Sequence, residues 1–364
     1  MHLGFKIDLL CKKLHQDMTK DLYKSVIILL ISVCTTQFVQ GQDIHFSHIK
    51  ATPTFINPAM TGLFNGHIRF TANYRGQWNA FTNGYRTIAA SADMRVKDLK
   101  SSIFGAGVSV FADKAGDLNF STNSLALNAS FIQLLGKKTW ASFGIQNSLT
   151  QNRFNFLDAK TLQQETADFS QNVFYWHLSS GLALMHELKN GNLLYIGTSV
   201  FHINRPDVSF LGTGAFTDPS AAELLDIKLS IHGGMDMNLF RSLELRAAFL
   251  FMDQGPHREI SVGSFLKYTE DFQFLNSDKT AKLYLGAWLR WYSEIDTSGA
   301  DALIATARLD INNTSIAISY DVNISTLTRI SSGQGGFELS IVKILNKKRK
   351  RVGNHKLKCP ADYF

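Results

Sequence analysis

Apolar and polar residues alternate with a period of two along most of the chain, most clearly near residue 70. Apolar residues or glycine occupy every second position from Phe64 to Tyr74, and polar residues, among them Arg69 and Arg75, occupy the positions between them. Successive side chains of a β-strand point to opposite faces, so this period predicts a strand with one apolar and one polar face. The same pattern recurs toward the C-terminus without a helical or βαβ rhythm, which predicts an all-β protein.

Fourteen such segments are bounded by turn residues, which is an even number, as a closed barrel of antiparallel strands requires. Each has around the ~9 to 11 residues that a tilted strand needs to cross a bilayer. The sequence therefore predicts a transmembrane antiparallel β-barrel of about 14 strands. The predicted strands are 64–75, 85–96, 102–112, 122–134, 138–149, 173–186, 192–203, 226–237, 241–252, 259–269, 280–292, 302–310, 314–324 and 335–344.

The connections alternate in length, as they do in outer-membrane barrels, which have short periplasmic turns and longer external loops. With the N-terminus inside, the segment 270–279 is a periplasmic connection longer than this rule favours. The other predicted periplasmic turns are 97–101, 135–138, 187–191 and 238–240. The predicted external loops are 76–84, 150–172, 204–225, 293–301 and 325–334, of which 150–172 and 204–225 are the longest.

The two faces of the predicted strands differ in polarity. One face forms apolar rows that suit lipid, namely Leu283, Leu285, Ala287, Leu289 and Trp291, and Leu243, Leu245, Ala247, Phe249 and Phe251. The other face carries charges of both signs, among them Lys282, Arg290, Glu244 and Arg246, which predicts a lumen that is either cross-linked by ion pairs or filled with water. A soluble β-sandwich also alternates and is the alternative fold.

The N-terminal residues read as a leader. The apolar stretch 26–33 follows Lys20 and Lys24 and precedes small and polar residues, which indicates a secretory signal peptide with cleavage near Gly41. Met18 begins this leader, so residues 1–17 are interpreted as an upstream extension. Only Cys359 then remains of three cysteines, which rules out an intramolecular disulfide in the mature chain. Export of an all-β chain without an apolar helix points to the outer membrane of a Gram-negative cell.

A basic cluster follows the last predicted strand. Residues 343–358 contain eight Lys or Arg and no Asp or Glu, against a net charge of +7 for the 364-residue chain. Such a cluster attracts anionic partners by long-range electrostatics. With an even strand count the cluster lies in the periplasm, where a protein or phospholipid headgroups are more plausible partners than nucleic acid. A solvated tail without a partner is the alternative.

Several short motifs suggest chemistry only weakly. The tripeptide Asn57-Pro58-Ala59 predicts a turn that caps the periplasmic mouth, with residues 43–63 packed against or into the lumen. His45 and His48 have a spacing that suits a metal only in a helix with a third ligand, so neither a metal nor a cofactor is predicted. The glycine clusters at 212–214 and 333–336 lack a following Lys-Ser/Thr and are read as turns.

Two functions of barrels are considered from the residues alone. A fourteen-stranded barrel encloses enough room for a porin or a hydrophobic-solute channel. An outer-membrane phospholipase needs a nucleophile beside a histidine, and His177 and Ser179 share one face of a predicted strand. Histidine in a polar lumen is mostly structural, so the chain is predicted not to be an enzyme.

Both ends of the mature chain resemble the PorP/SprF family of type IX secretion membrane proteins. The resemblance rests on Asp43-Ile44-His45-Phe46-Ser47-His48, Asn57-Pro58-Ala59-Met60-Thr61-Gly62, Asn73-Tyr74-Arg75-Gly76-Gln77-Trp78, Ser319-Tyr320-Asp321-Val322-Asn323-Ile324-Ser325, Gly335-Gly336-Phe337-Glu338-Leu339-Ser340 and Lys358-Cys359-Pro360. The terminal residues 361–364 depart from the family's usual ending. The resemblance implies an outer-membrane barrel of the secretion and gliding machinery that docks periplasmic ring or peptidoglycan-linked subunits and helps to present cargo such as adhesins.

These inferences divide the chain into four regions. Residues 1–41 are the extension and signal peptide, 42–63 a periplasmic or plug segment, 64–344 the barrel and 345–364 a basic periplasmic tail. Partner docking is expected at the periplasmic surface, and the predicted partner-binding residues are Asn57, Pro58, Lys347, Lys348, Arg349, Lys350 and Arg351.

Overall fold

A computed structural model describes nine stretches of the chain, all within the unit Gln42–Phe364. The described residues are 43–77, 84–99, 101–116, 120–155, 170–210, 222–270, 281–294, 297–325 and 333–346. The predicted leader and the basic residues Lys347, Lys348, Arg349, Lys350 and Arg351 lie outside them.

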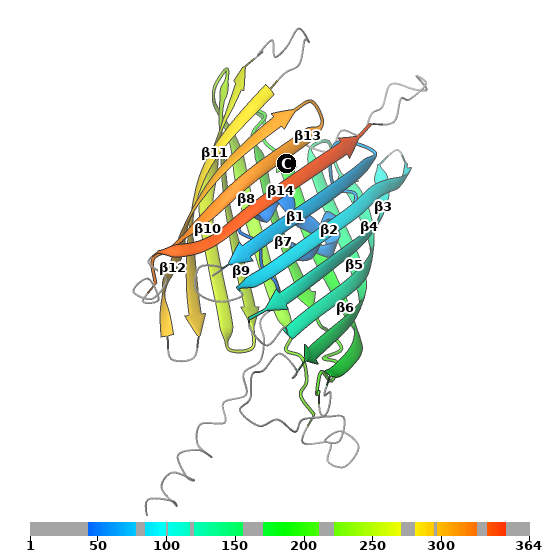
Figure 1. Cartoon of the computed structure of the whole chain (residues 1–364). Helices are drawn as coiled ribbons and strands as arrows, with labels where there is room; N and C mark the ends of the chain where they lie inside the picture. The colour runs from blue at the N-terminus through cyan, green and yellow to red at the C-terminus, as the bar shows by residue number, and fades with distance from the viewer. Residues whose placement is uncertain are drawn as a thin grey trace, which may run out of the picture. The chain divides into compact units, whose positions relative to one another are not determined.

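Fourteen antiparallel strands form a closed barrel in which each strand pairs with its neighbours in sequence (Figure 1). The barrel closes where β1 pairs with β14, from Ile68 opposite Leu345 to Gln77 opposite Gly336. The predicted all-β fold and barrel are therefore confirmed. The strands are β1 Ile68–Gln77, β2 Tyr85–Asp98, β3 Ser102–Ala115, β4 Phe120–Leu135, β5 Thr139–Asn155, β6 Ser170–Glu187, β7 Leu193–Phe201, β8 Lys228–Phe240, β9 Leu243–Gln254, β10 His257–Glu270, β11 Ala281–Glu294, β12 Thr297–Ile311, β13 Thr314–Asn323 and β14 Gln334–Leu345.

Every predicted strand overlaps an observed one, but each differs from it at one or both ends. The largest difference is at β5, which runs to Asn155 and not to residue 149, so that the predicted external loop 150–172 shortens to 156–169. Strand β1 begins at Ile68 and not at residue 64, because Phe64 turns into the interior and is 1% exposed. The external loop predicted at 293–301 is wrong: β11 runs to Glu294 and β12 begins at Thr297, so the strands themselves extend over most of that range.

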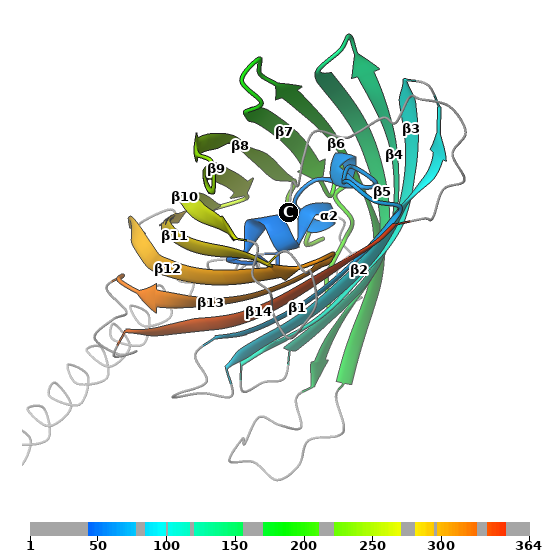
Figure 2. The ribbon, with the colours of Figure 1, turned by 90° about the horizontal axis from the view of Figure 1, so that it is seen from above.

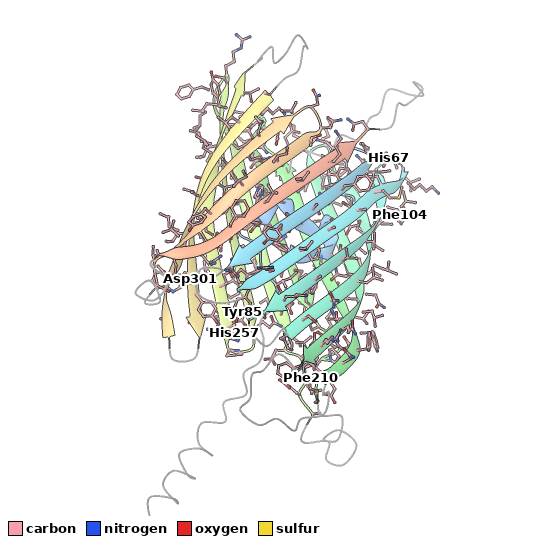
Figure 3. The ribbon with its side chains drawn as sticks, viewed as in Figure 1. His67, Tyr85, Phe104, Phe210, His257 and Asp301 are labelled. Carbon is pink, nitrogen blue, oxygen red and sulfur yellow. The ribbon has the colours of Figure 1, made fainter. Side chains whose placement is uncertain are left out.

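The two ends of the barrel differ in the length of their connections. We call the end where β1 begins and β14 ends the turn end, and the opposite end the loop end. At the turn end, two or three residues join β4 to β5, β8 to β9 and β12 to β13, although β10 and β11 are separated by the ten residues 271–280, close to the long connection predicted at 270–279. At the loop end, the 26 residues 202–227 separate β7 from β8 and the 14 residues 156–169 separate β5 from β6, although two-residue connections join β9 to β10 and β11 to β12. His67 and Phe104 mark the turn end in Figure 3, and Tyr85, His257 and Asp301 lie toward the loop end.

Alternation along the strands places apolar side chains outside and polar ones inside. On β11, Leu285 is 57% exposed and Trp291 is 45% exposed, whereas the inward Arg290 is 5% exposed. The predicted assignment of faces holds on β11. The outward apolar rows give the barrel a surface that suits lipid. No helix among the described residues is long and apolar enough to cross a membrane.

The interior is not uniformly polar, although the alternation along the strands predicts a polar lumen. The inward side chains of β10 and β11 include Phe265, Tyr284 and Trp288, each at most 2% exposed. The ring of Phe265 packs edge-on against Trp288 at 5.6 Å and against Tyr284 at 6.3 Å. These rings form a core with apolar residues of the N-terminal region, so the barrel encloses a packed interior.

Candidate functional site

The barrel interior holds residues 43–67, which we call the N-terminal segment (Figure 2). It contains three short helical turns, η1 Ile49–Ala51, α2 Pro53–Ile56 and η2 Pro58–Met60. Ala51, Thr54, Asn57, Ala59 and Thr61 are all 0% exposed. Helices of three or four residues are not stable alone in water, so the barrel wall must hold this conformation.

The N-terminal segment runs through the interior from the loop end to the turn end. At its start, Asp43 contacts His202 just beyond β7 and Lys228 at the start of β8, both at the loop end. At its finish, the amide of His67 donates to the carbonyl of Leu345, the last residue of β14. The segment thus crosses the whole lumen before the chain enters β1.

Asn57 is the centre of the contacts between the N-terminal segment and the wall. Its Nδ2 donates to the carbonyl oxygens of Leu182 (2.9 Å) and Thr198 (3.2 Å) and lies 3.1 Å from Nε2 of His232. Its Oδ1 accepts from the amide of Ala59 at 2.8 Å and so caps η2. One side chain therefore ties the helical turn to β6, β7 and β8.

Glycines in the wall allow this close approach. A Cβ added to Gly144 on β5 would collide with the backbone of Pro58 and Ala59, and one added to Gly181 on β6 would collide with Oδ1 of Asn57. Glycine inside a strand often marks a place where another backbone approaches closely. The Asn57-Pro58-Ala59 turn therefore packs directly against these two glycines.

Serine side chains of three strands bind the carbonyl groups of the N-terminal segment. Each hydroxyl donates to one carbonyl at 2.6 Å, and all three serines are buried or nearly so. Because a buried carbonyl without a partner is costly, these hydroxyls replace the hydrogen bonds that longer helices would supply. The pairs are Ser130 on β4 with Thr61, Ser142 on β5 with Ala59, and Ser199 on β7 with Ile56.

A buried charged cluster holds the N-terminal segment toward the loop end. Glu338 on β14 accepts from the amide of Ser47 at 2.7 Å, and Asp321 on β13 accepts from the Ser47 hydroxyl at 2.8 Å. Arg75 and Arg290 each donate to the same Oδ2 of Asp321, at 3.0 and 2.9 Å. Ion pairs therefore cross-link the interior here. This is one of the two outcomes predicted from the mixed charges, the other being a lumen filled with water.

A second ion pair lies where the N-terminal segment approaches the turn end. Arg69 on β1 and Asp93 on β2 make two parallel hydrogen bonds of 2.8 and 2.7 Å, and both side chains are 0% exposed. Each partner also reaches the segment: Arg69 donates to the carbonyl of Met60, and Asp93 accepts from the amide of Gly62. Removal of either charge would leave the other buried without its partner of opposite charge.

The N-terminal segment contributes charges of its own. Asp43 lies 2.7 Å from Nζ of Lys228 and 2.8 Å from Nε2 of His202. Burial raises the pKa of Asp43, but the interactions with His202 and Lys228 outweigh burial and hold this pKa well below its ordinary value. Lys50 pairs with Asp236 on β8 at 3.3 Å, and burial lowers its pKa to about 8 although Asp236 opposes this shift.

The structure places Asn57 and Pro58 in the interior, with Asn57 0% exposed and Pro58 buried. A partner at the outer surface would not reach these side chains in this conformation, and their partner-binding role stays a prediction. The turn predicted at Asn57-Pro58-Ala59 is present as η2, but its contacts are with the middle of strands β5 to β8. Sequence reasoning missed Gly144, Gly181 and the wall serines, although strand-interior glycine was the available signal.

The histidines among the candidate chemical groups contact residues other than the candidate nucleophile or a metal ligand set. Both ring nitrogens of His177 are engaged, with Thr150 at 3.2 Å and His202 at 3.1 Å, and the Ser179 hydroxyl has no hydrogen-bond partner among the described residues. The ring of His48 packs against Phe265 at 5.6 Å. No group of three potential metal ligands occurs in the described ranges.

These features define a class: a membrane-spanning β-barrel of outer-membrane type whose lumen is occupied by the chain's own N-terminal segment. A family model described as "Type IX secretion system membrane protein PorP/SprF" matches residues 38–342. The chain belongs to this family, and the resemblance noted at both ends of the sequence is confirmed.

Other comparisons add little to this assignment. Among curated proteins the comparison found no match. Solved barrels of low similarity include the Ralstonia pickettii toluene transporter TbuX (12% identity, 80% of this chain and 93% of that chain, TM-score 0.45) and the monoaromatic hydrocarbon channel CymD (10%, 85% and 96%, 0.46). The translocator domain of the autotransporter NalP from Neisseria meningitidis is a third (12%, 90% and 97%, 0.33). At these TM-scores the likenesses carry no functional information.

Proposed function

We propose that the protein is a non-enzymatic outer-membrane accessory of type IX secretion that docks periplasmic subunits and assists the delivery of cargo such as adhesins to the cell surface. Membership of the PorP/SprF family supports the secretion role. The occupied lumen supports an accessory role, because a barrel filled by its own chain is not built as an open pore for solutes.

The single observation that carries this choice is the set of contacts around Asn57. Its side chain joins the N-terminal segment to three strands, and wall glycines make room for the backbone beside it. A porin or solute channel is the second candidate function, and it would require this packed segment to leave the lumen. A phospholipase would require Ser179 to be activated by His177, whose ring nitrogens have other partners.

We place the docking surface at the turn end, which we take to be periplasmic. The short turns there and the basic residues 347–351 that follow β14 along the chain support this placement. A basic cluster attracts acidic partner surfaces at a distance and accelerates encounter. The long connections 156–169 and 202–227 at the loop end are then candidates for contact with cargo at the cell surface.

A deletion strain tests the secretion role. We expect surface adhesins to be lost while uptake of small solutes is normal. Normal adhesin display together with impaired solute uptake would favour the channel instead, and phospholipid hydrolysis by the purified barrel would favour the enzyme.

Crosslinking tests the docking surface. Replacement of Lys347, Lys348, Arg349, Lys350 and Arg351 by Gln should leave the barrel folded but reduce recovery of periplasmic subunits in a pull-down from native membranes. Equal recovery would remove the tail from the docking surface.

A further inference from the structure

We propose that the barrel interior is a peptide-binding site, and that the N-terminal segment occupies it as an intramolecular ligand which a segment of a client polypeptide can replace. This inference deepens the proposed function and rests on it for the identity of the client as exported cargo. The ligand class is a polypeptide whose peptide groups bind side chains of the wall and which presents an asparagine to β6, β7 and β8.

The wall binds many peptide groups of the N-terminal segment, in addition to its side chains. Side chains from β1, β4, β5 and β7 donate hydrogen bonds to carbonyl oxygens of the segment, at 2.6 to 3.4 Å. The donor and carbonyl pairs are Arg75 with His45, Asn73 with Ala51, Gln146 with Thr54, Ser199 with Ile56, Ser142 with Ala59, Arg69 with Met60 and Ser130 with Thr61. Peptide groups are common to all polypeptides, so such a wall can hold a different chain.

Carboxylates complete this recognition by accepting from amides of the N-terminal segment. Glu338 accepts from the amides of Ser47 and His48 at 2.7 and 3.1 Å, and Asp93 accepts from Gly62 at 2.7 Å. Donors and acceptors for both kinds of peptide group therefore line the lumen between its two ends. A lumen that carried solutes would have no need for this arrangement.

Apart from His67, which continues the pairing of β1 with β14 and β2, the N-terminal segment is not part of the hydrogen-bonded sheet. The barrel closes through β1 and β14, which pair over ten residues each, and the neighbour order of all fourteen strands is complete without residues 43–66. The segment can therefore leave the wall without breaking a strand pair. Exchange for another chain would replace one set of wall contacts by a similar set.

The wall also carries polar groups that the N-terminal segment does not use. The hydroxyls of Ser179 and Ser230 and the amide oxygen of Asn73 are buried and have no hydrogen-bond partner among the described residues. Buried polar groups in native proteins normally have partners. These groups are available to hydrogen bond with a chain of different sequence.

The test measures binding of a fluorescent peptide with the sequence of residues 43–64 to the purified full-length barrel by fluorescence anisotropy. Asn57→Ala in the protein weakens the intramolecular ligand and leaves the wall unchanged. Apparent affinity scales with the fraction of open sites, and the loss of three hydrogen bonds at about 1 kcal/mol each raises that fraction, so we expect the peptide to bind roughly a hundredfold tighter. The matched control is Asn65→Ala, because Asn65 belongs to the same segment but makes no side-chain hydrogen bond within the described residues.

A disulfide provides the complementary control. The hydroxyl oxygens of Thr54 and Ser109 lie 3.1 Å apart, so Thr54→Cys with Ser109→Cys, in a Cys359→Ser background, should link the N-terminal segment to β3 when oxidised. We expect the reduced barrel to bind the peptide and the oxidised barrel not to bind it. A peptide carrying Asn57→Ala should bind more weakly than the original peptide.

Two results would overturn the inference. One is equal peptide binding by the Asn57→Ala and Asn65→Ala barrels, both with a folded barrel by heat-dependent gel mobility. The other is equal binding by the oxidised and reduced disulfide variants, which would place the peptide on the outer surface. Either result leaves the proposed secretion role standing, because that role is tested separately by adhesin display in the deletion strain.

Discussion

Replacement of Asn57 by Ala should increase local opening of the N-terminal segment roughly hundredfold. The Asn57 Nδ2 has two hydrogens and contacts three acceptors, and its Oδ1 accepts one amide, so three hydrogen bonds are lost. At about 1 kcal/mol net for each bond, the loss is about 3 kcal/mol, and each 1.4 kcal/mol corresponds to a factor of about ten.

Hydrogen exchange measured by mass spectrometry reads this change directly. The informative amides are those of Met60, Thr61 and Leu63, which donate to carbonyl groups within the segment and not to the Asn57 side chain. In Asn57→Ala the exchange rates of these amides should rise by the same factor as the local opening of the segment, whereas the strand amides should keep their protection. Asn65→Ala should exchange like the unsubstituted protein. Unchanged protection of Met60 and Thr61 in a folded Asn57→Ala barrel would refute the assignment of Asn57 as the main anchor.

Three further predictions address the wall, the whole segment and pH. Gly144→Val should displace η2 and speed hydrogen exchange at Met60, because its Cβ collides with the Pro58 backbone. The control Gly299→Val should not speed this exchange, because an added Cβ there meets nothing within 4 Å. Equal exchange at Met60 in the two variants would contradict the close packing. Deletion of residues 43–63 should lower the temperature at which the barrel changes mobility on gels, and an unchanged transition would argue against packing in the lumen. Burial and the charge of Arg308 lower the pKa of His48 from 6.5 to about 3, so segment docking should be fully stable above pH 6.5 and weaken as pH falls toward 3. Exchange at Met60 should therefore rise with acid less steeply in His48→Gln than in the unsubstituted protein, and parallel pH profiles would contradict this.

The barrel could be predicted from the sequence because its signal is local. Every strand repeats the same two-residue alternation, as in Leu283 to Trp291, and lipid outside with polar groups inside imposes it along each strand. Strand ends were less predictable: residues 297–301 continue β12 although they include Ser298, Gly299 and Asp301, which are typical of loops.

The candidate site could be predicted only in outline. The N-terminal segment has no regular period, and its partners lie far along the chain, such as Leu182 and Thr198 for Asn57. The turn at Pro58 follows from local preferences, but its depth in the lumen depends on Gly144 and Gly181, whose role is visible only when the strands are assembled. The inward aromatic residues Tyr284 and Trp288 likewise read as ordinary strand residues until the segment packs beside them.

Single-channel recording in a planar bilayer tests the central claim most directly, namely that the lumen is filled by the N-terminal segment. The purified full-length protein should insert without a steady conductance at low voltage, since residues 43–67 pass through the interior and bind its wall. A stable ohmic conductance of porin size from folded full-length protein would contradict the account.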